Sequence, residues 1–430
     1  MKADLDAHLE RERLEGLLVV GPAKHNPSMA YFTGPAHLGG GYLARRTGSE
    51  PRLYVFPMER EEAARTGLRS ESLEWHAANK QAEGNPFETH AILLERILRD
   101  NEMTGRVLCC GITDAGFALE TVSRLRTKIP SLELVGFPES RSPLNQARAT
   151  KDETELTRIR QMGQRTIEVV GWVADFLTSQ DVRDGLLVNR TGEVVRVGDV
   201  KRRINLWLAE RGLENPEGTI FAIGHDAGVP HSVGRDDQPI PVGQPIVFDI
   251  FPCEGGGGYF YDLTRTWCLG HAPDEVEQVY QDVREAYRRG MDQVHEGVEC
   301  RALQIATCEF FEERGHPTVL NTPETLEGYV HSLGHGLGLA VHEPPHFHPL
   351  QEPPDILTGG HVVTIEPGLY YPSRNLGVRL EDTVAVGPNG AEVLAPYPMD
   401  LVLPMRGNSR GQTKSRAQAK KAKPSKKRSG

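Results

Sequence analysis

Acidic side chains interrupt apolar segments in the second half of the chain. Asp249 lies within Pro245 to Ile250, which otherwise has the composition of a buried strand, and Asp262 follows thirteen residues later. The glycines from Gly255 to Gly258 predict a tight turn, which would bring the two aspartates across adjacent strands. A buried carboxylate must be paired or coordinated, so both aspartates are candidate metal ligands.

Two glutamates repeat this arrangement downstream. Glu366 follows the apolar run that starts at Val362, and Glu381 lies in the middle of a strand expected over Val378 to Ala385. Taken singly, each acid is as readily explained as a buried ion-pair partner. Four acids at matched places in two strand pairs instead indicate a metal centre.

A segment rich in glycine and histidine, His331 to Glu343, adds a fifth candidate ligand. The glycines beside His335 allow the backbone to approach a site closely. One histidine with four carboxylates is a hard, oxygen-rich ligand set that suits Mn²⁺, Co²⁺ or Fe²⁺, with Zn²⁺ as a further candidate. Four carboxylates balance two divalent ions. Two ions roughly 3.5–4 Å apart can hold one hydroxide and polarise one carbonyl.

The string His342 to His346 matches the HExxH motif of zinc peptidases literally. That motif requires a helix, on which its two histidines share a face. Pro344 and Pro345 exclude a helix interior, so we do not expect a zinc peptidase of that type.

Composition sets the broad class. The chain has 430 residues, of which 38% are hydrophobic and 25% charged, as in a soluble protein of two domains. No apolar run approaches the roughly 20 residues that span a bilayer, and the first residues lack a secretory signal. We therefore expect a cytoplasmic protein without membrane contact. The six cysteines show no Cys-x-x-Cys spacing and are expected to be buried reduced thiols.

Charge is distributed unevenly along the chain. The net charge is −10, but residues 406–430 hold ten Lys and Arg and no acid, so the rest carries about −20. An acidic body argues against broad nucleic-acid binding. We expect the basic tail to be disordered, although it could serve nucleic acid through phosphate contacts.

Residues 1–145 predict a small α/β domain, because apolar strands alternate with helical patterns. The expected strands are Leu17–Val20, Leu53–Phe56, Val107–Cys110 and Leu132–Val135, and the expected helices are Asp4–Leu14, Pro86–Arg99 and Phe117–Leu125. A boundary rich in Ser, Pro, Asn and Gln follows near Ser140 to Ala149.

Residues 150–405 predict a second, larger domain. Thr150 and Glu153 have capping-box spacing, so a long helix is expected over Glu153 to Leu177. The other expected helices are Val200–Arg211, Glu275–Glu296 and Leu303–Arg314, and the strands are Thr219–Ile223, Pro245–Ile250, His361–Ile365 and Val378–Ala385.

These residues resemble metallopeptidase family M24, in the branch of aminopeptidase P and prolidase. The order of the five candidate ligands matches that family, as does the histidine segment. Thr264-Arg265-Thr266 after the second aspartate and Pro367-Gly368 after the first glutamate also match. The resemblance covers about residues 150–400. It implies a pita-bread catalytic domain preceded by a smaller creatinase-like α/β domain.

The resemblance also implies roles for the residues. Asp249, Asp262, Glu366 and Glu381 would hold two metal ions, and His335 would ligate one of them. The bridging water would lose a proton, which Glu366 accepts or relays, and attack the scissile carbonyl. His231 and His342 would stabilise the intermediate or orient the substrate. His331 and Arg379 are further candidates, either beside the metal ligands or in substrate binding; Arg379 lies two residues from Glu381, and a purely structural role is equally open for His331.

The implied reaction is hydrolysis of the bond before proline at the second position of a short peptide. A homodimer is implied, in which the first domain helps to close the site. Dipeptidase and aminopeptidase activities both remain open, as does the metal. The alternatives are a same-fold protein that binds protein or RNA, and a same-fold hydrolase of another small amide. One departure from the family is Phe251-Pro252-Cys253, where many members have glycine after the Asp-Ile pair; the run Glu254 to Gly258 is also slightly long.

Overall fold

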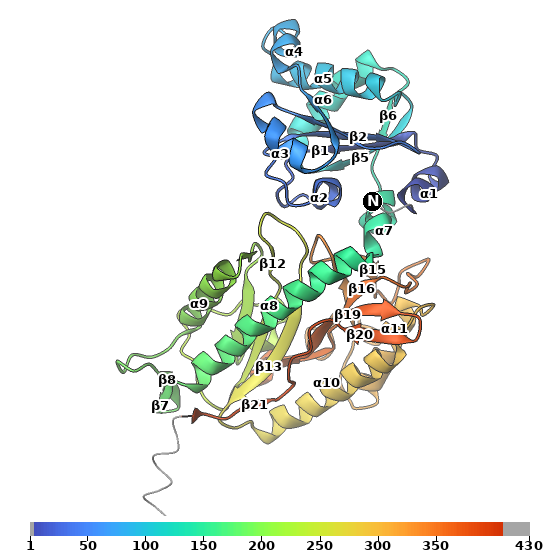
Figure 1. The fold of residues 1–430 in the computed structure, drawn as a ribbon. Helices are drawn as coiled ribbons and strands as arrows, with labels where there is room; N and C mark the ends of the chain where they lie inside the picture. The colour runs from blue at the N-terminus through green and yellow to red at the C-terminus, as the bar shows by residue number, and fades with distance from the viewer. Residues whose placement is uncertain (1–3, 407–430) are drawn as a thin grey trace, which may run out of the picture.

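The structure, a computed structural model, describes residues 4–406, which form a smaller and a larger α/β unit (Figure 1). The basic tail predicted over residues 406–430 lies, apart from Arg406, outside the described residues. Within residues 4–406, no helix is both long and apolar enough to cross a bilayer.

The smaller unit is built on a mixed six-stranded sheet of order β4-β3-β2-β1-β5-β6. Its strands are β1 (Gly16–Val20), β2 (Gly41–Arg46), β3 (Arg52–Val55), β4 (Arg69–Ser72), β5 (Arg106–Gly111) and β6 (Glu133–Val135). The four predicted strands are β1, β3, β5 and β6; the sequence reading missed β2 and β4. β1 pairs in parallel with β5 and antiparallel with β2.

Helices cover both faces of this sheet. They are α1 (Asp4–Arg11), α2 (Pro27–Thr33), α3 (Arg60–Arg65), α4 (Trp75–Gln81), α5 (Pro86–Asp100) and α6 (Ala115–Lys128), with a 3-10 turn η1 (Pro57–Glu59). Side chains alternate between the faces: Leu17 and Val19 pack into one core cluster and Leu18 into another. The alternation confirms a layered α/β unit.

The segment between the units is helical. It contains η2 (Glu139–Arg141) and α7 (Pro143–Ala149), followed by the long helix α8 (Glu153–Thr178). The predicted capping box is wrong in its residues. Asp152 accepts from the backbone N–H of Glu155, and the Glu155 carboxylate accepts from that of Asp152. Thr150 is instead extended, in an isolated bridge with His361.

The larger unit contains a nine-stranded sheet of order β10-β11-β13-β19-β16-β14-β15, with β20 beside β19 and β21 beside β13. Its strands are β10 (Thr219–Ile223), β11 (Pro245–Ile250), β13 (Leu263–Leu269), β14 (His335–Gly336), β15 (Glu343–His346), β16 (Val362–Ile365), β19 (Glu381–Gly387), β20 (Gly390–Val393) and β21 (Val402–Leu403). Three two-stranded sheets pair β7 (Asp181–Arg183) with β8 (Leu186–Val188), β9 (Leu213–Glu214) with β12 (Cys253–Glu254), and β17 (Gly368–Tyr371) with β18 (Leu376–Arg379).

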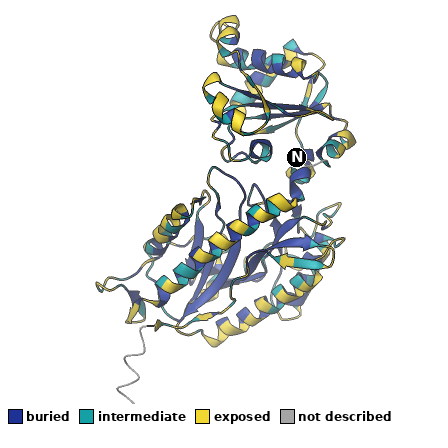
Figure 2. Ribbon diagram, in the orientation of Figure 1, coloured by how far each residue is buried: buried dark blue, intermediate teal, exposed yellow. Residues whose placement is uncertain are grey.

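Helices enclose the large sheet, whose central strands are almost wholly buried, whereas β20 and β21 are partly exposed (Figures 1 and 2). Beside α8 lies α9 (Val197–Glu210); the others are α10 (Asp274–Gln293) and α11 (Cys300–Glu312), with short turns η3 (Asp226–Gly228) and η4 (Pro372–Arg374). Buried side chains of α8 and α9 pack with those of β10, β11 and β13. Those of α10 and α11 pack with β16 to β19 in two further clusters.

The single strand predicted over Val378 to Ala385 is wrong, because the structure divides it at Leu380 into β18 and β19. β18 forms a hairpin with β17, whereas β19 joins the large sheet between β13 and β16. Glu381 therefore begins a strand instead of lying in its middle. Both halves are buried on both faces, so the apolar pattern continues across the break.

Glu343 connects the linker helix to the large sheet. Its carboxylate is paired with Arg148 of α7 and lies 3.2 Å from the Lys151 ammonium, and it accepts a hydrogen bond from the Ala340 N–H. All three charged side chains are at most 7% exposed. Burial raises the pKa of Glu343, but the two cations hold it below its usual range. The glutamate of the HExxH string is thus a structural anchor.

We expect Glu343→Gln to lower the free energy of unfolding by roughly 3–5 kcal/mol, because two buried cations would lose their counter-charge. Urea denaturation of the full chain measures this change. The matched control is Glu352→Gln, whose side chain is 73% exposed beside Arg301 and should contribute less than about 1 kcal/mol. Equal, small effects of the two substitutions would contradict the anchoring role.

Candidate metal centre

Five adjacent strands bring the five predicted ligands to one place. Asp249 lies in β11, Asp262 directly precedes β13, and Glu381 begins β19. Glu366 directly follows β16, and His335 begins β14. These five strands are consecutive neighbours in the sheet. Each of them therefore contributes one candidate ligand to the same place on the sheet.

The strand register places the acids on one face. Asp249 is opposite Thr264, and Thr264 is opposite Glu381. Asp262 precedes Thr264 by two residues and so shares its face. On the other side of β19, Ile365 pairs with Asp382, so the next residues, Glu366 and Glu381, extend the ladder toward each other. The predicted meeting of two acid-bearing strand pairs thus occurs within one continuous ladder.

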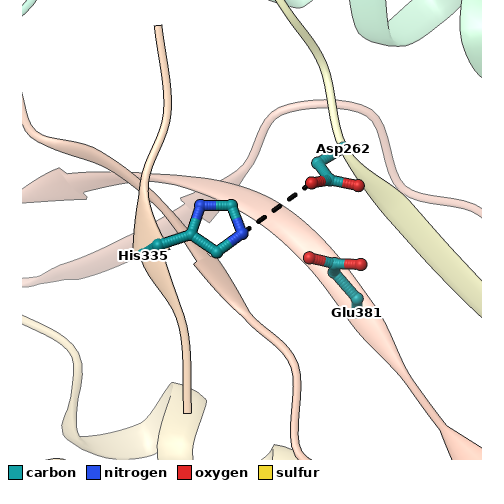
Figure 3. Close-up of side chains that lie close together, drawn as sticks. All are labelled: Asp262, His335 and Glu381. Atoms are coloured by element: carbon teal, nitrogen blue, oxygen red, sulfur yellow. Dashed lines mark ion pairs between the residues drawn. The ribbon is translucent and has the colours of Figure 1, made fainter. Parts of the chain in front are cut away.

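Three of these side chains point toward one another in Figure 3. One ligand atom each from Asp262, His335 and Glu381 lie within 4.8 Å of one another. The Nε2 atom of His335 is 3.8 Å from Asp262 Oδ2 and 3.5 Å from Glu366 Oε1. The arrangement is a buried cluster with one imidazole facing several carboxylate oxygens.

His335 is oriented for ligation. Its Nδ1 lies 3.1 Å from the carbonyl oxygen of Gly336, so Nδ1–H donates there and Nε2 keeps a lone pair directed at the carboxylates. Burial, with His342 nearby, lowers the pKa of His335 to about 3. The imidazole is therefore neutral at physiological pH, as metal ligation requires.

Crowding of like charges dominates the electrostatics of the acids. Burial and the neighbouring carboxylates raise the pKa values of Asp262 and Glu366 well above their ordinary range. Burial and Asp249 raise the pKa of Glu381 to about 8. Without cations, all three groups take up protons more readily than exposed carboxyls do, and Glu381 is largely protonated at neutral pH.

The residues fit a pair of divalent cations. Asp249 Oδ1 and Asp262 Oδ1 are buried and have no hydrogen-bond partner among the described residues. A buried carboxylate oxygen without a partner is costly, and a bound cation would satisfy it. The donor set is four carboxylates and one imidazole, which suits a hard or borderline divalent ion.

Arg379 donates hydrogen bonds that hold the candidate ligands in position. Its Nη2 donates to Asp249 Oδ2 at 2.5 Å, and its Nε donates to Thr264 Oγ1 at 3.1 Å. The Thr264 hydroxyl in turn donates to Glu381 Oε2 at 2.6 Å. One buried guanidinium thus orients candidate ligands on two strands, which agrees with the place beside the metal ligands that the sequence suggested for Arg379.

Tyr370 and His331 extend this support. Arg379 Nη1 donates to the Tyr370 hydroxyl at 2.7 Å, and that hydroxyl donates to His331 Nε2 at 2.8 Å. The Nδ1–H of His331 donates to the Ser332 carbonyl at 2.7 Å. Burial, reinforced by Arg379, lowers the pKa of His331 to about 3. His331 lines the cavity but has both ring nitrogens engaged, which favours the structural role.

A cavity of about 570 Å³ opens onto the cluster and is lined by all the predicted site residues. His231 and His342 are exposed to it, and neither ring makes a hydrogen bond within the described part of the chain. The His342 ring stacks edge-on against His335, with centroids 4.3 Å apart. Both imidazoles are therefore free to contact a substrate beside the metal ligands.

Several cavity residues were not identified from the sequence. They are Glu217, Ile220, Pro230, Val233, Phe251, Ser332, Gly334, Val341, His346, Phe347 and His348. Phe251 follows Asp249 by two residues, so strand periodicity carried a signal for it. Glu217 and His348 lie outside the strands, where no such pattern exists. His346 ends β15, which confirms that the HExxH string is not helical.

The unusual segment after Asp249 has two structural roles. Phe251 lines the cavity, while Glu254 forms a two-pronged ion pair with Arg158 of α8 at 3.0 and 2.5 Å. The run Glu254 to Gly258 lies close to the smaller unit. A Cβ added at Gly257 would overlap the backbone of His25. The turn is thus one of the places where the two units meet.

A sequence profile of metallopeptidase family M24 matches residues 158–388. The chain is 28% identical over 376 residues to an Xaa-Pro dipeptidase of Pyrococcus furiosus, covering 86% of this chain and 92% of that one. It is 25% identical over 398 residues to an Xaa-Pro dipeptidase of Pyrococcus horikoshii, covering 92% and 96%.

Solved structures share the fold. The prolidase from Pyrococcus horikoshii superposes with a TM-score of 0.71 at 23% identity, over 93% of this chain and 98% of that chain. An X-Pro aminopeptidase from Thermotoga maritima superposes with a TM-score of 0.69 at 22% identity, over 91% and 99%. The expected two-part α/β architecture is therefore confirmed over nearly the whole chain.

We expect Tyr370→Phe to weaken metal binding about tenfold or more, because Arg379 loses a partner that helps orient Asp249. Calorimetric titration of metal-free protein with Mn²⁺ measures the dissociation constant. Tyr371→Phe is the matched control, since that hydroxyl contacts His316 instead. An unchanged constant in Tyr370→Phe would show that the hydroxyl does not support the ligands.

Metal-free protein should lose stability as pH rises from about 5 to 8. Glu381 has a pKa of about 8 when folded and an ordinary value of 4.5 when exposed, so the folded state binds more protons in that interval. Thermal unfolding at several pH values measures the trend. Saturating Mn²⁺ should remove it, and Glu381→Gln should reduce it. A metal-free trend that is the same in wild type and Glu381→Gln would contradict the assignment.

Proposed function

Because this chain belongs to metallopeptidase family M24, we propose that it is a dinuclear-metal exopeptidase that cleaves the N-terminal Xaa-Pro bond of peptides. The observation that carries the proposal is the convergence of four carboxylates and one imidazole from five adjacent strands. Two of the carboxylate oxygens there have no other partner. The cluster lines a cavity large enough for a short peptide.

The five ligands provide for two ions. Asp249, Asp262, Glu366 and Glu381 would hold and bridge them, and His335 would ligate one through Nε2. Two divalent ions bound there would polarise the scissile carbonyl and lower the pKa of a water molecule. The metal-free pKa values of the carboxylates support this assignment, since the site is electrostatically incomplete without cations.

Protein groups would complete the reaction. Glu366 is the proposed acceptor of the proton from the attacking water, because its carboxylate faces the cavity beside His335. His231 and His342 would donate hydrogen bonds to the oxygen of the tetrahedral intermediate, since both rings are exposed in the cavity without other partners. Arg379 is assigned to positioning Asp249, and His331 to positioning Tyr370.

The relatives named Xaa-Pro dipeptidase support the choice of bond. An Xaa-Pro bond lacks an amide hydrogen, and the proline ring fixes its own φ angle. A peptidase that recognises an extended backbone through that hydrogen would miss the bond. Apolar cavity residues, among them Phe251, Val341 and Phe347, provide a surface for the ring.

Metal, assembly and compartment complete the proposal. The oxygen-rich ligand set supports manganese, with cobalt, iron or zinc as competitors. We also propose a homodimer and a cytoplasmic location, the latter supported by six free cysteines that form no disulfide. Elemental analysis, light scattering of the purified protein and cell fractionation test these three points separately.

We expect Mn²⁺-dependent hydrolysis of Ala-Pro-Ala by the full chain. A chelator should abolish it, and His335→Ala should reduce it by a factor of about 100 or more, because one ion loses its only imidazole ligand. Product release followed by chromatography, beside elemental analysis of both proteins, measures this. Metal-loaded wild type that cleaves no Xaa-Pro substrate would overturn the proposed bond specificity while leaving the metal centre.

A further inference from the structure

We propose that the cavity disfavours a free carboxylate on the proline, so that the enzyme prefers peptides of three or more residues over dipeptides. This inference rests on the proposed Xaa-Pro cleavage and adds the class of substrate. In a dipeptide the proline after the scissile bond carries the C-terminal carboxylate. In a longer peptide the same position carries an amide.

The cavity offers no free cation to such a carboxylate. Arg379 is the only Lys or Arg among its lining residues within the described chain. Its side chain is 4% exposed, and four of its five N–H donors are engaged. They donate to Asp249, Thr264, Tyr370 and the Pro230 carbonyl. Proteins usually bind carboxylates through a free, forked guanidinium, which this cavity lacks.

The other charged side chains at or near the cavity wall, apart from the metal ligands and Arg379, are negative. Two divalent ions would balance the four ligand carboxylates, and Arg379 contributes one further positive charge. Glu217 is exposed at the cavity wall and offsets that charge. A second anion lies just behind the wall, where the Asp355 carboxylate is 3.5 Å from His346 Nδ1 and accepts from the His346 backbone N–H at 2.8 Å. This balance suits the ammonium end of a peptide.

The remaining polar wall suits an amide. Four imidazoles reach the cavity besides His331 and the ligand His335: His231, His342, His346 and His348. The N–H of an imidazole can donate to a peptide carbonyl, which makes these side chains good partners for a continuing chain. A carboxylate placed there would lose water without gaining an opposite charge. The penalty falls on dipeptides alone.

The test compares kcat/KM of the Mn²⁺-loaded full chain for Ala-Pro, Ala-Pro-amide and Ala-Pro-Ala. We expect the amide and the tripeptide to exceed the dipeptide about tenfold or more, since one unpaired charge changes affinity by at least that factor. Equal or faster cleavage of Ala-Pro would overturn the inference. Absence of cleavage of all three would instead overturn the proposed bond specificity.

Product binding gives a second readout that does not depend on turnover. Calorimetry of the Mn²⁺-loaded protein with prolinamide and with proline should show tighter binding of prolinamide by about tenfold. Tighter binding of proline would overturn the inference even if no peptide is cleaved.

Arginines added to the cavity wall test whether the lack of a cation causes the preference for longer peptides. The two positions chosen for an added cation lie near opposite edges of the large sheet. Val233 is 52% exposed, and its carbonyl accepts a hydrogen bond from the backbone N–H of Phe221 in β10. His348 follows β15, the strand at the other edge. We expect Val233→Arg or His348→Arg to raise the ratio of dipeptide to tripeptide cleavage about tenfold. Val233→Gln and His348→Gln are the neutral controls of comparable length. If neither arginine raises the ratio above its control, lack of a cation is not the cause.

Discussion

Repulsion among four carboxylates, three of them buried and that of Glu366 half-buried, is the main constraint on the centre of the larger unit. Asp249, Asp262, Glu366 and Glu381 lie close enough that their charges oppose one another, and burial removes the water that would screen them. Such a group persists only with cations, with protons or with a buried counter-charge. Arg379 provides part of the buried counter-charge. One oxygen each of Asp249 and Asp262 has no hydrogen-bond partner among the described residues and is available to a cation.

A sheet is well suited to this task because neighbouring strands are held at fixed spacing. Each acid lies in a different strand or directly at its end, so the paired strands hold the four charges close to one another. Arg379 donates hydrogen bonds to Thr264 and Tyr370 as well as to Asp249. Thr264 in turn donates to Glu381, so one guanidinium holds side chains of several strands in place. The glycines flanking His335 let β14 lie close to its neighbours; a Cβ at Gly334 would overlap the carbonyl oxygen of Thr364. Packing and chemistry therefore use the same hydrogen bonds.

The candidate ligands can be recognised in the sequence because a charged residue in an apolar strand is conspicuous. The same reasoning placed Glu381 wrongly within its strand, since a transfer between two buried sheets leaves the alternation unchanged at Leu380. Tyr370 escaped notice because one more aromatic residue in a buried strand is unremarkable. Arg379 was recognised as a candidate two residues before Glu381, but its ion pair with Asp249 joins β18 to β11, two strands that no local pattern in the sequence places together. Local patterns thus predict which residues are unusual, while partners depend on register.

The Glu343 anchor bears on how separable the two units are. The residue that follows His342 in the chain is balanced by Arg148 and Lys151, which lie on either side of the sequence boundary between the units. A fragment that began at Thr150 would keep every candidate metal ligand yet lose Arg148, which lies beside one of the Glu343 oxygens. Evolutionary exchange of the smaller unit for another would face the same condition. The helix α7 therefore belongs to both units, because Leu144 and Ala147 pack in the core of the smaller unit while Arg148 pairs with Glu343 of the larger one.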